Sequence, residues 1–156
     1  MYPDCDEILK MAPDYDIIPV CREIYADVIT PITLLRKLAA VSKRYYLLES
    51  VEGGEKWGRY SFLGFDPVMR VKCSCGKVTI EKDGEETEKV TDKPLEVLRE
   101  ILKDYKAPRL AGLPPFAGGF VGYFAYAMIG YAEPKLNIKK GTFNDYDMML
   151  FDKVIA

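Results

Sequence analysis

The chain has 156 residues, of which 49% are hydrophobic and 29% are charged, and its formal net charge at pH 7 is −2. This composition is typical of a soluble globular protein, and the slightly acidic balance argues against nucleic acid or an anionic membrane as a partner. The chain contains no histidine, which excludes Ser-His and Cys-His catalytic pairs.

The opening residues, MYPDCDEILKMAPDYDIIPV, lack the basic start and the apolar core of a signal peptide. No apolar run in the sequence reaches the roughly 20 residues that a membrane-spanning helix needs. We therefore expect a cytoplasmic protein.

The first half of the chain predicts strands around one helix. Residues 17–25, IIPVCREIY, have the composition of a strand. Thr30 followed by Pro31 is typical of a helix start, and apolar residues then recur at helical spacing. Further strands are predicted at about 45–50 and 60–65, on either side of a glycine-rich turn.

The second half predicts hairpins, a second helix and a last strand. Residues 68–91 have the pattern of strands interrupted at Gly76 and at Asp83-Gly84, a strong hairpin signal. A helix is predicted after Pro94. The segment FVGYFAYAMIGY is expected to be buried, and YDMMLFDKVIA is predicted to be the final strand.

This order of elements predicts an α+β fold with largely antiparallel sheets and two or three helices. The final strand stays apolar up to Ala156. Because domains seldom end in an unfinished ladder, we expect the chain to be a piece of a longer protein.

The cysteines do not predict a metal site. Cys73 and Cys75 are separated by one residue, whereas zinc ligands are usually separated by two to four, and histidine ligands are absent. Reduced thiols packed as small hydrophobic groups are the favoured interpretation.

A concentration of polar groups lies in YYLLESVEGGEKWGRYSFLGFDP, residues 45–67. Gly53 and Gly58 have the spacing of a phosphate loop. However, Arg59 and Tyr60 stand where that loop needs lysine and Ser/Thr, and no helix follows. We therefore reject a nucleotide site.

An amino-acid pocket is a second interpretation of the same stretch. Glu49 and Ser50 offer acceptors for an ammonium group, Arg59 offers donors for a carboxylate, and Leu48 and Phe62 offer an apolar wall. The alternative is a surface hairpin whose charges face water, which spacing alone favours.

The stretch LLESVEGGEKWGRYSFLGFDP, together with GGFVGYFAY further along, resembles the N-terminal region of anthranilate synthase component I. The opening PVCREIYADVITPITLLRKL and the ending YDMMLFDKVIA resemble the family in order and spacing. The resemblance therefore covers essentially the whole chain.

The resemblance implies that residues 1–156 are a regulatory N-terminal region, half of a larger chorismate-utilising architecture. The full-length parent would be a lyase that converts chorismate and glutamine or ammonia into anthranilate and pyruvate, the first step of tryptophan biosynthesis. In the family, a C-terminal domain absent from this chain holds chorismate and Mg²⁺, and a glutamine amidotransferase partner supplies ammonia. We therefore expect this chain alone to be inactive, without catalytic residues and without a cofactor.

The resemblance also implies a feedback site for L-tryptophan, which C-terminal residues complete in the family. Carried over by position, the residues that would line it are Leu48, Glu49, Ser50, Arg59, Tyr60 and Ser61. One position departs from the family pattern: Ala127 stands in GYFAYAMIG where the family usually has an acid.

Two other interpretations remain open. The paralogous aminodeoxychorismate synthase component I of folate synthesis shares the architecture, although LLESVEGGEKWGRYSFLG looks more like the anthranilate branch. A free-standing amino-acid-binding module is the third interpretation. The codons after Ala156 would separate them, because a module predicts a stop and either synthase predicts a long downstream domain.

Overall fold

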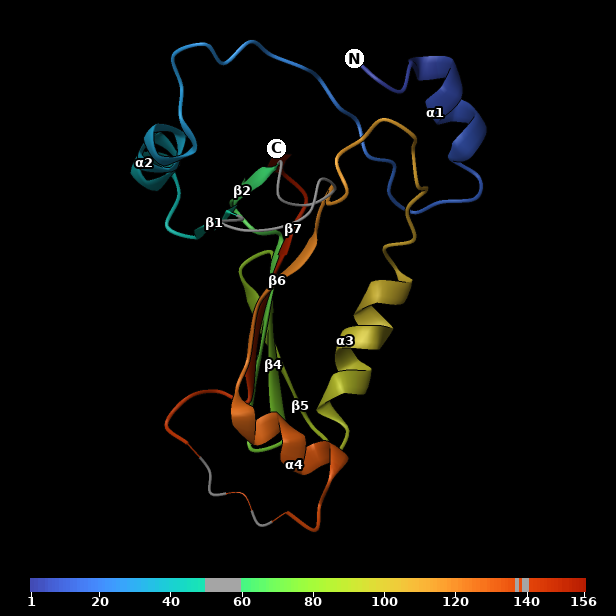
Figure 1. Ribbon diagram of the computed structural model, residues 1–156. Helices are drawn as coiled ribbons and strands as arrows, with labels where there is room; N and C mark the ends of the chain where they lie inside the picture. Colours follow the sequence, from blue (N-terminus) through green and yellow to red (C-terminus); the bar gives the residue numbers. More distant parts are fainter. Residues whose placement is uncertain (50–59, 137, 139–140) are drawn as a thin grey trace.

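The computed structural model describes residues 1–49, 60–136, 138 and 141–156 (Figure 1). Its α-helices are α1 (Cys5–Met11), α2 (Pro31–Val41), α3 (Pro94–Lys103) and α4 (Ile129–Ala132), the last preceded by a 3₁₀ turn, η1 (Tyr126–Met128). The strands are β1 (Tyr45–Glu49), β2 (Ser61–Phe65), β3 (Met69–Ser74), β4 (Lys77–Lys82), β5 (Glu85–Val90), β6 (Gly119–Phe124), β7 (Tyr146–Phe151) and β8 (Val154–Ile155). Among these described helices, none combines the length and the apolar character that crossing a bilayer requires.

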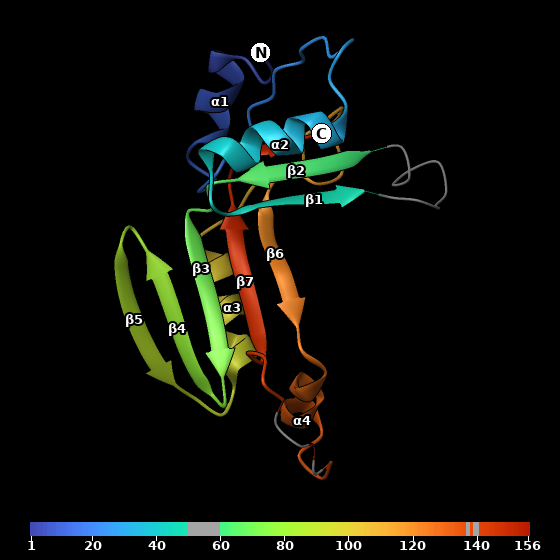
Figure 2. The ribbon, with the colours of Figure 1, turned by 90° about the vertical axis from the view of Figure 1, so that its left-hand side faces the viewer.

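The strands form two sheets in which all the pairings between named strands are antiparallel. The smaller sheet has the order β1-β2-β8 and the larger has the order β5-β4-β3-β7-β6. The smaller sheet lies at one end of the larger one, and β1 and β2 run across the direction of β3 and β7 (Figure 2). The predicted α+β class with largely antiparallel sheets is confirmed.

The main core lies between α3 and one face of the larger sheet. Alternate residues of β3, β4 and β7 point to this face, because side chains alternate along a strand, and they pack against Val97 and Leu98 of α3. Tyr146 is fully buried there, and its hydroxyl donates a hydrogen bond to the carbonyl of Pro94 at 3.0 Å. This bond ties the first turn of α3 to the centre of the sheet.

The helix start predicted at Thr30 and Pro31 is confirmed, and it is the start of α2. Thr30 is the N-cap of α2, its hydroxyl accepts a hydrogen bond from the Thr33 amide at 3.2 Å, and Pro31 occupies the first turn. The cap satisfies one of the amides that a helix start leaves unpaired, and the proline ring is already set for the helix.

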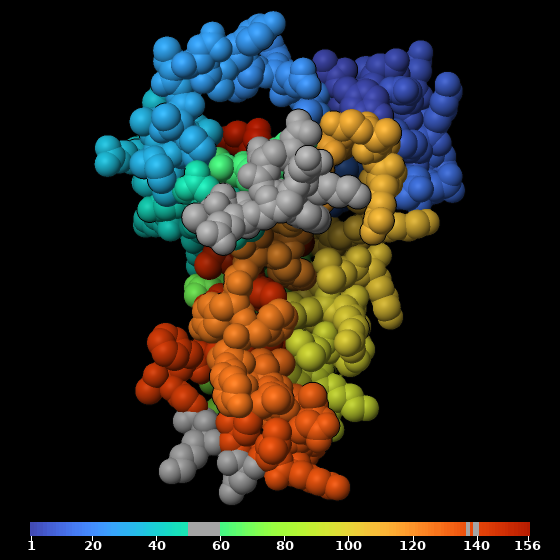
Figure 3. All heavy atoms as spheres, in the orientation of Figure 1, coloured from blue at the N-terminus to red at the C-terminus, as the bar shows by residue number. Residues whose placement is uncertain are grey.

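The strand predicted at residues 17–25 is not present. The described segment between α1 and α2 has only an isolated bridge between Tyr2 and Cys21. Figure 3 shows this segment arching away from the body of the molecule. Ile24 and Tyr25 are accordingly 74% and 97% exposed. The apolar side chains that predicted a buried strand therefore lie on the surface of the described structure.

The predicted final strand is divided in two. β7 ends at Phe151, and the chain resumes pairing at Val154, so that β7 lies inside the larger sheet while β8 pairs with β2 in the smaller one. The two residues between them, Asp152 and Lys153, therefore carry the chain from one sheet to the other.

An aromatic group fills the junction of the two sheets. The ring of Tyr46 on β1 lies over Gly64 on β2, where any Cβ would overlap it. The same ring meets Phe151 of β7 edge-on, with 4.7 Å between centroids, and Phe116 at 6.5 Å. The absence of a side chain at Gly64 thus leaves room for the Tyr46 ring to lie over β2 and reach Phe151.

Candidate functional site

The candidate site predicted from the sequence lies at the far end of the β1–β2 ladder. Leu48 pairs with Phe62 and Glu49 pairs with Ser61 in the antiparallel register. Of the six predicted site residues, Leu48, Glu49, Tyr60 and Ser61 lie within the described residues, while Ser50 and Arg59 lie outside them.

One face of this ladder end is apolar. Leu48 is 47% exposed and faces the same side as its partner Phe62. The Phe62 ring stacks on the ring of Tyr60 at 5.7 Å and meets Phe116 edge-on at the same separation. Phe62 itself is 5% exposed, so the apolar surface left open at this end of the ladder is that of Leu48 and Tyr60.

The opposite face of the ladder end is polar. Glu49 points away from Leu48 because neighbouring residues of a strand alternate, and the Ser61 hydroxyl donates a hydrogen bond to Glu49 Oε1 at 3.4 Å. The structure therefore brings Glu49 together with Ser61, and Tyr60 together with the Leu48–Phe62 pair, but it places the two groups on different faces. A ligand that contacts both groups must reach from one face of the ladder to the other.

Phe116 was not predicted to lie near this site. It belongs to the loop between α3 and β6, more than 50 residues from Phe62 in the sequence, and it reaches the site only through the fold. The Pro114-Pro115 pair before it indicates a loop but carries no signal of what that loop contacts.

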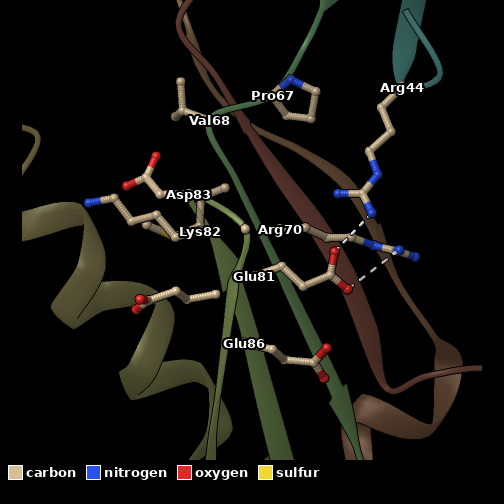
Figure 4. Close-up of a pocket in the computed structure, with 11 residues that line it drawn as sticks. Arg44, Pro67, Val68, Arg70, Glu81, Lys82, Asp83 and Glu86 are labelled. Carbon is tan, nitrogen blue, oxygen red and sulfur yellow. Dashed lines mark hydrogen bonds and ion pairs between the residues drawn. The ribbon is translucent and has the colours of Figure 1, made fainter.

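A second group of charged residues lies where the two sheets meet, beside a cleft of about 380 Å³ that is lined in part by Arg44, Arg70 and Glu81 (Figure 4). Glu81 on β4 is its centre. Its carboxylate lies 2.8 Å from Arg44 Nη2, 2.6 Å from Lys72 Nζ and 3.8 Å from Arg70 Nη1. Arg70 in turn donates two hydrogen bonds to Asp147, at 2.8 and 2.6 Å. We call these five residues the charge cluster.

The charge cluster lowers the pKa of Glu81, chiefly because Lys72 donates a hydrogen bond to the ionised carboxylate, and burial only partly opposes this effect. The cations of the cluster are already paired with Glu81 or Asp147. The charge cluster is thus a structural network of ion pairs, and it joins β3, β4 and β7 to the segment before β1.

We expect Glu81→Gln to lower the free energy of unfolding by about 1–2 kcal/mol at neutral pH, because it leaves three cations without their common anion. Glu81 ionises more readily in the folded chain than at its ordinary pKa of 4.5. Its contribution is therefore fully present above that pH and is lost as the pH falls through the folded value. Urea unfolding at several pH values measures both effects.

The matched control is Glu88→Gln, which removes an acid from the same sheet whose ion pair with Lys77 is half exposed. We expect this change to cost about 0–1 kcal/mol. An equal loss from both variants, or a difference that does not shrink as the pH is lowered below the ordinary pKa of Glu81, would contradict the assigned role of Glu81.

A third polar group, centred on Asp145, lies at the other end of the larger sheet. Asp145, which is 9% exposed, accepts hydrogen bonds from the Cys75 amide at 2.7 Å and the Tyr131 hydroxyl at 2.8 Å. The Cys73 thiol lies 3.7 Å from the same carboxylate, and burial raises its pKa to about 11. Cys73 is thus a protonated, packed thiol rather than a nucleophile. A cleft of about 490 Å³ beside this group is lined in part by Ala127.

Within residues 1–49, 60–136, 138 and 141–156, no set of three or more acidic or cysteine side chains has an arrangement that could hold a metal ion. The described part of the chain has an apolar side chain and a carboxylate exposed at the β1–β2 end, Leu48 and Glu49, and structural polar networks elsewhere.

Comparison with known proteins gives a consistent result. No protein-family model matches the chain. It is 43% identical over 158 residues to anthranilate synthase component 1 of Acetivibrio thermocellus, which covers 99% of this chain and 32% of the relative. It is 43% identical over 133 residues to the protein of that name from Pseudomonas aeruginosa, covering 84% of this chain and 27% of the relative. The corresponding protein of Aquifex aeolicus is 35% identical over 147 residues, or 93% of this chain and 29% of that protein.

The chain thus spans roughly 30% of the length of the curated relatives it matches. Among solved structures, anthranilate synthase component I from Streptococcus pneumoniae matches 86% of this chain and 28% of that chain, with 26% identity and a TM-score of 0.48. The resemblance identified from the sequence is confirmed.

Proposed function

We propose that this chain, which resembles anthranilate synthase component 1 along nearly its whole length, is the N-terminal regulatory region of such a synthase. The observation that carries the proposal is 43% identity over 99% of the chain. The parent protein would be a lyase that forms anthranilate and pyruvate from chorismate and glutamine or ammonia, as the first step of tryptophan biosynthesis. Residues 1–156 form one part of its architecture in this proposal, and the chorismate-binding catalytic domain lies outside them.

The role proposed for the described residues is to bind L-tryptophan as a feedback inhibitor. The apolar surface of Leu48 and Tyr60, which is backed by the buried Phe62 ring, suits the indole ring. Glu49 suits the ammonium group as an acceptor, and the Ser61 hydroxyl lies 3.4 Å from its carboxylate. An α-amino acid bound there would have to contact both faces of the ladder. Ser50 and Arg59 complete the proposed set by position in the sequence.

The catalytic chemistry is proposed to take place away from this chain. Mg²⁺ and chorismate would be held by the catalytic domain, and a glutamine amidotransferase partner would supply ammonia. The chain's own residues would bind and orient the inhibitor, so the isolated chain would form no anthranilate.

The test uses the full-length gene product with chorismate, Mg²⁺ and ammonium, and it follows anthranilate fluorescence with and without L-tryptophan. We expect product formation that L-tryptophan inhibits, and no product from residues 1–156 alone. Formation of aminodeoxychorismate would support the folate paralogue instead. A gene that stops after codon 156, with amino-acid binding but no turnover, would support the free-standing module.

A further inference from the structure

Residues 22–29, which we call the arch, are held at both ends. At one end, Cys21 and Tyr2 exchange two backbone hydrogen bonds, at 2.9 and 2.7 Å. At the other end, Thr30 is the N-cap of α2. The arch spans the distance between these two points, from the N-terminal segment to the helix that follows it (Figure 1).

The arch carries apolar side chains that the described structure leaves uncovered. Every residue from 22 to 29 is exposed. Tyr25 and Val28 are 97% and 91% exposed, and Ile24 is nearly as open. A single exposed apolar side chain is ordinary in a soluble protein, but several of them on one short segment mark an interaction surface.

The backbone of the arch is also open. Within the described part of the chain, its one backbone hydrogen bond runs from the Ile29 amide to the Ala26 carbonyl at 3.2 Å. Residues 22–25 belong to the stretch whose composition predicts a strand. A strand needs a neighbour that pairs its amides and carbonyls. The composition and the open backbone together indicate that this neighbour lies outside the described residues.

An open space lies beneath the arch. Figure 3 shows this space between the arch and the body of the molecule. Figures 1 and 2 both place the C-terminal residue, Ala156, below the arch. The strand that leads to Ala156 is β8, which lies at the edge of the smaller sheet with β2 as its one neighbour among the described strands. The arch, the space and the edge strand therefore lie together.

The lengths of the relatives indicate what occupies this space. The chain covers 32%, 27% and 29% of the three relatives described above, so more than two thirds of such a protein lies outside it. In the proposed synthase, the residues that follow Ala156 would leave the structure beneath the arch. Because they are tethered there, their effective concentration at the arch exceeds that of a second molecule in dilute solution.

We propose that the arch is a docking surface for the part of the synthase that lies outside residues 1–156. This inference rests on the function proposed above. An apolar segment of that part occupies the open space and covers Ile24, Tyr25 and Val28. The contact lies within one polypeptide, so it does not depend on protein concentration. The arch is thus part of the interface between the regulatory region and the catalytic part.

The first experiment places the photoreactive residue p-benzoylphenylalanine at position 25 of the full-length gene product, in place of Tyr25. This replacement keeps an aromatic ring on an exposed side chain. After irradiation, we expect a cross-link within one polypeptide that joins the peptide of residue 25 to a peptide from beyond residue 156. Mass spectrometry of the digested protein identifies both peptides.

The second experiment compares thiol labelling of Val28→Cys and Val90→Cys in the full-length gene product. Val90 is the matched control, because it is 81% exposed and belongs to the charged edge strand β5. We expect iodoacetamide to label Val28→Cys at least about tenfold more slowly than Val90→Cys, because a covered thiol reacts only when its cover opens. In urea the two rates should be equal. Peptide mass spectrometry separates these thiols from the native cysteines.

The outcomes separate the inference from the function on which it rests. Equal labelling rates in the folded protein, or cross-links only to peptides within residues 1–156, overturn the docking role, whereas anthranilate formation by the same protein leaves the proposed function standing. Cross-links between two polypeptides, with protection that falls on dilution, assign the arch to a second copy and also overturn the inference. A wild-type gene product that forms no anthranilate overturns the proposed function and, with it, the partner proposed here.

Discussion

Replacing Gly122 with alanine is expected to lower the free energy of unfolding by about 3 kcal/mol or more. A Cβ on Gly122 would overlap the carbonyl oxygen of Asp147 and the Cα of Met148 on the neighbouring strand. These are backbone atoms of β7, the strand between β3 and β6, so they cannot move aside without disturbing the ladder. Urea unfolding followed by circular dichroism measures the loss, which is a large share of the stability of an ordinary domain.

Gly130→Ala is the matched control for this prediction. Nothing lies within 4 Å of the Cβ that it would add, and Gly130 is in α4. Because alanine favours helices over glycine, we expect stability to be unchanged or to rise by up to about 1 kcal/mol. If both variants unfold at the wild-type urea concentration, the close approach of β6 to β7 is wrong.

Replacing Glu49 with glutamine is expected to weaken inhibition of the full-length gene product by L-tryptophan about ten- to a hundredfold. Glutamine keeps the shape of the side chain and an acceptor for the Ser61 hydroxyl, so the hairpin is retained. It removes the charge proposed to face the ligand's ammonium group. The rate at saturating chorismate should change little, because the inhibitor contacts are absent from the transition state.

The measurement is an inhibition curve for L-tryptophan at fixed chorismate. Glu86→Gln serves as control, because it removes an exposed acid from β5 of the larger sheet and should leave the curve unchanged. Tryptophan sensitivity that survives Glu49→Gln would mean that Glu49 is only the polar end of a strand, and that the inhibitor binds elsewhere.

Helix starts and tight turns were predicted from the sequence, because a few neighbouring residues determine them. Thr30-Pro31 marked the start of α2, and Asp83-Gly84 marked the turn between β4 and β5, where both residues have positive φ. The start of α1 carries an equally local signal. Asp4 and Glu7 form a capping box, in which each side chain accepts a hydrogen bond from the other residue's amide.

The errors occurred where long-range contacts decide the structure. Residues 120–131 were expected to be buried, but Tyr123, Phe124 and Tyr126 are 42%, 51% and 82% exposed, because β6 is an edge strand. Residues 17–25 are apolar enough for a strand, but the described segment has no neighbouring strand beyond the bridge to Tyr2. The division of the last strand at Asp152 depends on the presence of β2 beside Val154, which periodicity does not reveal.

The candidate site shows the same division between local and long-range information. Strand alternation alone would have placed Leu48 and Glu49 on opposite faces, which the structure bears out. The contacts of Phe116 with Phe62 and of Arg44 with Glu81 join residues far apart in the sequence, so no local pattern predicted them.

The position of β7 has a consequence for the order of events during synthesis on the ribosome. Strands β3, β4 and β5 are consecutive and form a meander that can pair as soon as residue 90 has emerged. β6 pairs with β7 alone, and β3 also needs β7 on its other side, so neither is complete until Phe151 has left the exit tunnel. For the time needed to translate about 60 residues, a few seconds to about ten at ordinary rates, the buried side chains of Val71 and Cys73 lack part of their cover. A nascent chain stalled before Tyr146 therefore exposes an open edge of β3, which is the surface that a chaperone or a second nascent chain would meet first.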